Sequence, residues 1–282
     1  MQSSRKKFWL IFGIVCASVV VICTAFALAT RLKTVTVEFR TRLAENETVL
    51  EQGVIDKVLK SGDFNYGKCV LFMNFNENIS NIEKSNPYVK VEQVIRHFPN
   101  VARVYISERI PKFRIRDEEN EDKWYILDAD FKVVDVVTGD VKAQNYGESS
   151  YYEKTIEISP DSLTLTSYVG DFVDDKLDQG FLNSIVSGVV SRAEELSIVK
   201  SVKISKNNGY KFTLTMKNSG INNDDGCEIV IQGESNLEKK VFAGISCFCD
   251  STENQHEIVD LSNKVITIEE INGVLKGIMN DK

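Results

Sequence analysis

The first long feature of the hydrophobic pattern is an uncharged apolar run over residues 8–29. As a helix, its 22 residues would reach about 33 Å, which is enough to cross the hydrocarbon core of a bilayer. A cleaved signal peptide is the alternative, because Ala27 and Ala29 suit a small-residue cleavage site. The run exceeds the roughly 7–15 residues of a signal-peptide core, so we favour a transmembrane helix over residues 8–29 after a short tail, residues 1–7.

Basic residues flank this run on both sides, so charge alone does not set its orientation. They are Arg5, Lys6 and Lys7 before it, and Arg31, Lys33, Arg40 and Arg42 after it. A seven-residue tail carries no domain, so we expect all folded function to lie after residue 30.

The pattern of residues 33–111 predicts a small α+β unit. Residues 34–39 alternate as a half-buried strand does, and residues 50–59 have apolar positions at helical spacing up to Ser61-Gly62. A shorter helix is expected over residues 79–84, followed by strands over residues 88–98 and 102–107. The mixed parity of the first of these strands indicates a bulge or two covered faces. The order predicts two helices on one face of a three-stranded sheet.

Three of the four prolines punctuate this unit at twelve-residue intervals. Pro87 ends a helix, Pro99 turns a hairpin, and Pro111 marks a strand end or a sheet edge because it cannot donate to a ladder. A polyproline ligand would need prolines about three residues apart. A repeat is excluded because the amino-acid sequences of the two twelve-residue intervals do not resemble each other.

Residues 112–270 predict a second, mixed β-rich domain. We expect a hairpin over residues 124–134, weak strands near 155–158 and 162–166, and a helix over 181–196. Beyond these, we expect a hairpin over 202–216, a loop over 221–226, a strand over 228–231, a helix over 237–246, and strands over 258–261 and 265–268. The remaining residues, 271–282, form a C-terminal tail in which Ile271, Val274, Leu275 and Ile278 predict a short amphipathic helix opened by Thr267 and Glu270.

The composition is that of a folded protein, with 43% hydrophobic and 27% charged residues. A net charge of −7 argues against a nucleic-acid binder, which needs an excess of lysine and arginine. The cysteines beyond the apolar run lack zinc-site spacing, and we expect buried thiols. A disulfide from Cys227 to Cys247 or Cys249 is left open, because sequence does not set connectivity.

A search for catalytic chemistry favours a non-enzymatic protein with no metal or cofactor. The two histidines, His97 and His256, are expected in a strand and in a polar loop. No nucleophile, phosphate-binding or zinc-protease motif occurs. The acidic pairs Asp128 with Asp130 and Asp174 with Asp175 are better explained by turns and helix starts. Binding at an exposed sheet edge is the more natural role.

Several short motifs resemble the bacterial cell-division proteins of the FtsQ/DivIB family. The strongest are Asn86-Pro87-Tyr88-Val89, Phe98-Pro99-Asn100 and Glu108-Arg109-Ile110-Pro111, which stand in the family's order; residues 125–128 and 258–261 add weaker support. Two departures are Phe131, where the family often has glycine, and Ser262-Asn263, where an Arg-Tyr pair can follow Asp-Leu.

The resemblance implies an α+β chain with a cytoplasmic tail, one transmembrane helix, a POTRA domain over residues 33–111 and a β-domain over 112–270. It gives Pro87, Pro99, Glu108, Arg109 and Pro111 a structural role. It further implies a division scaffold in the cytoplasmic (inner) membrane, single-pass with its folded domains outside, at the septum. The implied partners are FtsL- and FtsB/DivIC-like proteins and a septal peptidoglycan synthase, whose activity the scaffold would regulate.

We expect the partner to pair with a terminal strand at a sheet edge, formed by Asp260, Leu261, Ser262, Val265, Ile266 and Thr267. Two other functions remain open. The first is a POTRA-containing chaperone or scaffold of another envelope assembly or export system, and the second is an extracytoplasmic enzyme.

Overall fold

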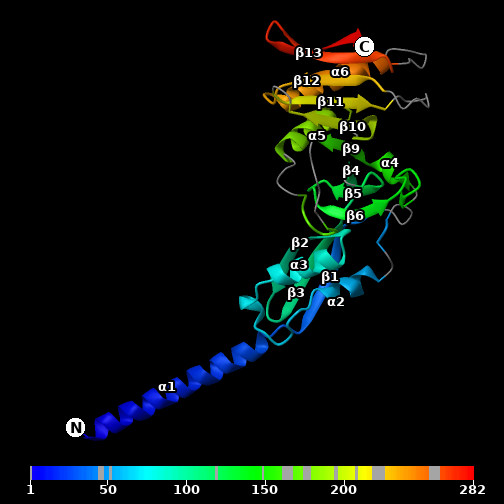
Figure 1. The fold of residues 1–282 in the computed structure, drawn as a ribbon. Coiled ribbons are helices and arrows are strands. Elements are labelled where there is room, and N and C mark those ends of the chain that lie inside the picture. The colour runs from blue at the N-terminus through cyan, green and yellow to red at the C-terminus, as the bar shows by residue number, and fades with distance from the viewer. Residues whose placement is uncertain are drawn as a thin grey trace. The chain divides into compact units, whose positions relative to one another are not determined.

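The computed structural model divides the chain into two compact units, Met1–Glu108 and Arg109–Lys282 (Figure 1). The structure describes residues 2–43, 48–50, 53–117, 120–147, 149–160, 168–173, 179–193, 196–206, 209–217, 226–253 and 261–282. The predicted strand over 162–166, the loop over 221–225, residues 258–260 with Asp260, and the side chains of Asp174, Asp175 and His256 lie outside these ranges.

The first unit begins with the long helix α1 (Gln2–Ala29). Within it, Trp9–Ala29 is long and apolar enough to cross a membrane, with 21 residues at a mean hydropathy of 2.7, none of them buried. The helix ends at Ala29, and both the amide and the hydroxyl of the next residue, Thr30, donate to the carbonyl of Phe26, at 3.0 and 2.9 Å.

A three-stranded sheet follows, with the strand order β1-β3-β2. Its elements are β1 (Thr34–Thr41), α2 (Val54–Ser61), the 3-10 turn η1 (Val70–Phe72), α3 (Asn76–Ser85), β2 (Val89–His97) and β3 (Val101–Glu108). The predicted order of strands and helices is confirmed. The mixed parity of β2 is explained by a register shift between Val91 and Gln93, where the β2–β3 ladder is irregular.

The second unit is built on one nine-stranded sheet with the order β14-β13-β12-β11-β10-β9-β4-β5-β6. The strands are β4 (Pro111–Arg116), β5 (Lys123–Asp128), β6 (Val133–Thr138), β9 (Ile156–Pro160), β10 (Val199–Ser205), β11 (Lys211–Met216), β12 (Glu228–Gln232), β13 (Lys264–Ile271) and β14 (Val274–Asp281). A small ribbon, β7 (Asn145–Tyr146) with β8 (Ser149–Ser150), and the short helix α4 (Tyr151–Lys154) lie between β6 and β9 in the chain.

Two longer helices pack on the sheet of the second unit, α5 (Gln179–Ala193) and α6 (Leu237–Glu253), with the 3-10 turn η2 (Leu196–Ile198) after α5. The apolar stripe predicted for α5 is buried at Leu182, Ile185 and Val189 in one core with the strands. Helix α6 contacts α5, β12, β13 and β14, so it covers the sheet near its β14 end (Figure 1). The fold is therefore α+β, as the sequence predicts.

Two expectations about the C-terminal residues are wrong. Residues 274–281 form strand β14 rather than a short helix, because Asn272 and Gly273 take positive φ angles of 54° and 77° and reverse the chain. As a result, β13 lies between β12 and β14 and is not the edge of the sheet.

A candidate partner-binding edge and groove

Strand β14 forms one edge of the large sheet. It pairs with β13 from Ile271↔Val274 to Lys264↔Asp281 without a register shift, and Asn272-Gly273 make the two-residue turn between them. Among the described residues, no strand pairs with the outer side of β14, so its outward backbone groups are available to a further strand.

The register shows which amides of β14 point away from β13. In a two-residue turn the amide after the turn bonds back across it, so Val274 and every second residue after it face β13. The amide of Lys282 agrees with this parity, because it donates to the carbonyl of Asn263 at 2.8 Å. The outward amides therefore belong to Leu275, Gly277, Met279 and Asp281, the last residue of the strand.

Helix α6 lies close against this hairpin because two glycines permit the approach. A Cβ on Gly277 would lie 2.6 Å from the Cβ of Cys247 and 2.9 Å from the carbonyl oxygen of Ala243. A Cβ on Gly244 would lie 2.4 Å from the Cγ2 of Ile229 on β12. Both are closer than side chains pack, so glycine at these positions sets the height of α6 above the sheet.

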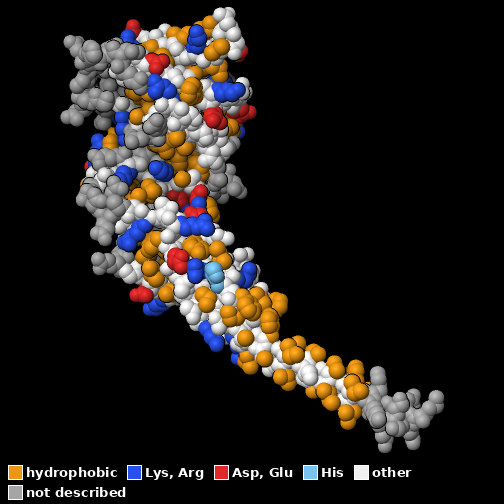
Figure 2. Space-filling model, turned by 180° about the vertical axis from the view of Figure 1, so that it is seen from behind, with side chains coloured by type: hydrophobic (Ala, Val, Ile, Leu, Met, Phe, Trp, Pro, Cys, Tyr) orange, Lys and Arg blue, Asp and Glu red, His pale blue; other side chains and the backbone are white. Residues whose placement is uncertain are grey.

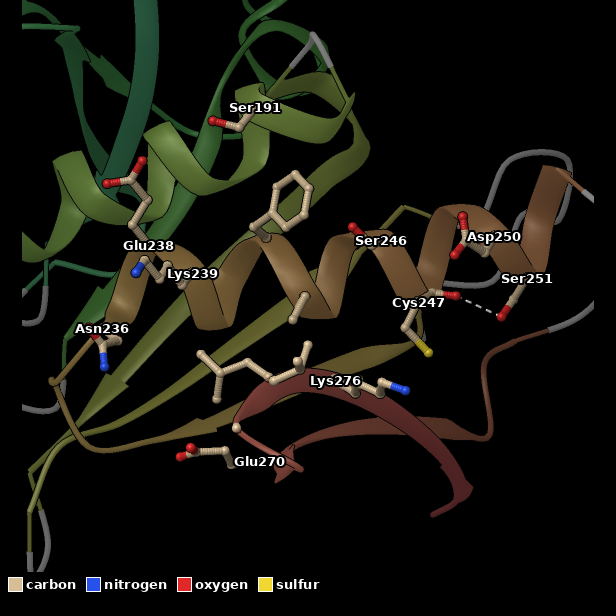
Figure 3. Close-up of a pocket in the computed structure, with 16 residues that line it drawn as sticks. Ser191, Asn236, Glu238, Lys239, Ser246, Cys247, Asp250, Ser251, Glu270 and Lys276 are labelled. Atoms are coloured by element: carbon tan, nitrogen blue, oxygen red, sulfur yellow. Dashed lines mark hydrogen bonds between the residues drawn. The ribbon is translucent and has the colours of Figure 1, made fainter.

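A groove of about 860 Å³ lies between α6 and the β13–β14 hairpin (Figure 3). Ser246, Cys247 and Asp250 line it from α6, and Glu270 and Lys276 line it from the hairpin. Two large apolar side chains that line it are largely exposed, with Phe242 42% and Val274 56% exposed. The groove thus places an apolar surface with a charged rim beside the open edge.

The thiols near the groove are protonated at neutral pH. Burial raises the pKa of Cys227 to about 11, although the ammonium of Lys282 opposes this shift; burial also raises the pKa of Cys247. Cys227, Cys247 and Cys249 are not joined in disulfides in this structure, and the raised pKa values make Cys227 and Cys247 poor nucleophiles.

The residues predicted to bind a partner lie in and before β13, one strand away from the edge. Leu261 and Ile266 are buried, while Ser262, Val265 and Thr267 are half-buried. Asp260 lies outside the described residues. The prediction missed β14 itself, although the dipeptide Asn272-Gly273 between two β-prone runs is a strong hairpin signal.

Glu108 and Arg109 are neighbours in the chain, and the side chain of each makes polar contacts within its own unit. The carboxylate of Glu108 accepts hydrogen bonds from the hydroxyl of Thr48 at 2.8 Å and from the amides of Leu43 and Val49. Arg109 forms a buried ion pair with Asp128. Both side chains therefore have structural partners.

The three prolines lie at the ends of secondary-structure elements. Pro87 follows α3 and precedes β2, Pro99 lies in the β2–β3 turn, and Pro111 is the first residue of β4 in the second unit.

The remaining candidates for acid–base chemistry lie in strands and turns. Asp128 accepts hydrogen bonds from the amides of Asp130 and Lys132, both at 2.9 Å, and so fixes the β5–β6 turn. His97 is half-buried at the end of β2.

The chain is similar to a protein of bacterial cell division over part of its length. A stretch of 73 residues is 32% identical to the cell division protein DivIB of Clostridium tetani. The match covers 26% of this chain and 26% of that relative, so the chain spans about a quarter of the relative's length. No protein-family model matches the chain. The similarity, together with the apolar N-terminal helix, is consistent with a membrane-anchored cell-division scaffold.

Proposed function

We propose that this protein is a non-enzymatic scaffold of the cell-division machinery, anchored in the cytoplasmic membrane by α1 with both folded units on the outer side. The apolar helix, the predicted order of elements in the first unit and the similarity to DivIB support this proposal. The protein would act at the septum, where it links partners that control peptidoglycan synthesis.

The partner-binding surface in this proposal is the outer side of β14. A partner segment adds as a further strand and bonds to the outward amides of Leu275, Gly277 and Met279. Alternate side chains of that segment then enter the groove beneath α6, where Phe242 and Val274 offer apolar contacts. FtsL- and FtsB/DivIC-like proteins are the proposed partners.

The single observation that carries this proposal is the coincidence of an uninterrupted edge strand with an adjoining groove. Main-chain hydrogen bonds at an edge supply affinity for any extended peptide, whereas a side-chain pocket supplies selection among sequences. The two features together suit a dedicated protein partner.

Photo-crosslinking tests the location of the partner strand. A benzophenone amino acid replaces Lys276 on β14 in one protein and Thr138 on β6 in the matched control; both positions are exposed and both lie in edge strands. Each full-length protein is co-expressed with the FtsL- and DivIC-like proteins of the same organism. We expect crosslinks at position 276 alone. Equal crosslinking at both positions, or none at 276 while the partners still co-purify, would contradict the proposal.

A proline substitution tests the pairing itself. Met279→Pro removes one outward amide, whereas Met279→Ala removes the side chain and keeps the amide. Loss of a hydrogen bond worth about 1 kcal/mol predicts roughly fivefold weaker partner binding for proline than for alanine. Equal affinities for two folded variants would argue against strand addition.

Localisation tests the wider role. A fluorescent fusion concentrated at midcell in dividing cells supports the division scaffold. An even distribution around the envelope would favour a scaffold of another envelope assembly.

A further inference from the structure

Helix α1 runs directly into the folded part of the first unit. Thr30, the residue after α1, is fully buried, and its carbonyl accepts a hydrogen bond from the amide of Val70 at 2.8 Å. Leu32 donates to the carbonyl of Lys68 at 2.8 Å and accepts from the amide of Gly67 at 3.0 Å. Backbone hydrogen bonds thus join residues 67–70 to residues 30–32, which directly follow the helix.

The β2–β3 turn is fastened to the same place. The amide of Lys33 donates to the carbonyl of Asn100 at 2.9 Å. The ring of Phe98, in this turn, lies 6.2 Å from the ring of Phe26, measured between centroids. Phe98 nevertheless remains 65% exposed. The turn therefore lies beside the last turn of α1 with a large apolar side chain facing outward.

The depth of Phe98 follows from the length of the span. Trp9–Ala29 has 21 residues, which extend about 31 Å and so match a hydrocarbon core of about 30 Å. Phe26 precedes the end of this span by three residues, or about 4.5 Å. A ring packed on Phe26 lies at the level of the apolar span when α1 crosses a bilayer.

A second loop places apolar side chains on the same end of the unit. Leu71 and Phe72 directly follow Val70, which is bonded to Thr30, and they are 39% and 87% exposed. Such exposure of a phenylalanine is costly in water and favourable at a lipid interface. Figure 2 shows hydrophobic side chains continuing from α1 onto the adjoining end of the first unit.

The three segments next to the end of α1 carry basic charges only, although Asp63 and Glu77 line the same hollow as Lys68 and Phe72. Segments 30–34, 67–73 and 96–100 contain no aspartate or glutamate, and their basic residues, all exposed, are Arg31, Lys33, Lys68 and Arg96. Lysine and arginine beside an apolar surface place their charged groups among lipid phosphates.

We infer that the end of the first unit next to α1 is a lipid-binding surface, with Phe98 and Phe72 inserted at the boundary between headgroups and acyl chains. The basic residues of the three segments bind anionic headgroups around them. This inference rests on the proposed membrane anchoring by α1. It gives the first unit a fixed contact with the membrane in addition to its covalent anchor.

Tryptophan fluorescence in vesicles tests this inference with the full chain. The two native tryptophans, Trp9 and Trp124, are replaced by phenylalanine, and Phe98→Trp or Phe72→Trp is introduced singly. Each protein is reconstituted into phosphatidylcholine–phosphatidylglycerol vesicles that contain lipids brominated near the headgroup or near the chain end. We expect blue-shifted emission and stronger quenching by the shallow bromines at both positions.

Two controls separate this inference from the anchoring itself. Tyr88→Trp, in the same background, lies ten positions from Phe98 along the hairpin, about 30 Å away, and should not be quenched. A protein that keeps Trp9 reports on the span. Quenching of Trp9 without quenching at positions 98 and 72 would overturn the lipid surface and leave the anchor intact. Absence of quenching at all of these positions would overturn the anchoring as well.

Discussion

The two edges of the large sheet are built differently. At β6, the chain segment 168–173 lies against the start of the strand: the amide of Val133 donates to Asp171, and its carbonyl accepts from Gly170, both at 2.8 Å. A further bridge joins Lys132 to Phe172. At β14, eight residues pair with β13 on one side, and within the described ranges no strand pairs with the other side.

This difference supports the proposal that a partner strand adds at β14. Proteins usually protect sheet edges from unwanted pairing by covering or shortening them. The shorter edge β6 follows that rule at its start, whereas β14 is long, regular and bordered by a groove. An edge left open beside a groove is suited to a chosen partner strand.

The largest expected effect is a loss of folding stability, and it should be greater in the inner strand β13 than in the edge strand β14. Ile266 on β13 is fully buried, so Ile266→Ala should lower the free energy of unfolding by about 2–5 kcal/mol. Ile278 on β14 is half-buried, and Ile278→Ala should cost less than about 1 kcal/mol. Urea unfolding measures both. Equal losses would mean that β13 and β14 are packed alike.

A smaller effect tests the close contact between β14 and α6. Gly277→Ala places a Cβ 2.6 Å from that of Cys247, and overpacking of this kind costs about 1–3 kcal/mol. Thermal unfolding should show the loss, together with weaker partner binding as β14 moves away from the helix. Lys276→Ala, at the neighbouring exposed position, should change stability by less than about 0.5 kcal/mol.

A third prediction concerns the covered edge, strand β6, and the segment 168–173 that lies against it. Gly170 has a φ of 92°, which strains any other residue, so Gly170→Ala should cost about 1 kcal/mol and loosen segment 168–173 from β6. Hydrogen exchange should then accelerate at the amide of Val133. Unchanged protection of that amide would show that the cover does not depend on Gly170.

The smallest effect concerns the end of β14. The ammonium of Lys282 lies 2.9 Å from the carboxylate of Glu228, and both side chains are about one-third exposed, so Lys282→Ala should cost only about 0.2–1 kcal/mol. Removing this cation should also raise the pKa of Cys227 further above its value of about 11. Alkylation of Cys227, followed by mass spectrometry across pH 8–11, should shift to higher pH in the variant.

The same thiol predicts a pH dependence of folding. Because its pKa is higher in the folded protein than in the unfolded chain, the folded state favours the protonated thiol. This contribution to stability is complete below the unfolded pKa of about 8.5 and is lost as pH rises through about 11. Cys227→Ser, compared across pH 8–11, should show a weaker decline in stability than the parent protein.

Local signals were sufficient to predict much of the fold. The proline-bounded β2–β3 hairpin, the α5 stripe and the hairpin of β10 and β11 each follow from residues close together in the chain. The helix predicted near residues 267–278 is wrong. It was expected because Thr267 and Glu270 fit a helix start and the apolar residues that follow fit helical spacing. Pairing with β13 selects the strand instead, and the Asn272-Gly273 turn makes that pairing possible.

The identity of the edge could not come from local patterns. The large sheet contains three parallel pairs between strands distant in the chain, β4 with β9, β9 with β10, and β12 with β13. Which strand is outermost depends on these crossovers, so a segment such as residues 262–268 can resemble an edge and lie inside the sheet. The groove likewise depends on α6 lying above a hairpin that follows it in sequence.

Under the proposed anchoring by α1, its direct passage into the first unit at Thr30 makes the orientation of that unit depend on bilayer thickness. In a membrane thinner than the 21-residue span, α1 relieves the hydrophobic mismatch by tilting, and the bonds from Thr30 and Leu32 make the first unit tilt with it. In a thicker membrane, the loops bearing Phe98 and Phe72 are drawn toward the acyl chains. A flexible spacer would absorb both changes. In this chain both changes would reach the first unit, so the hydrocarbon thickness of its native membrane should match the length of the span from Trp9 to Ala29.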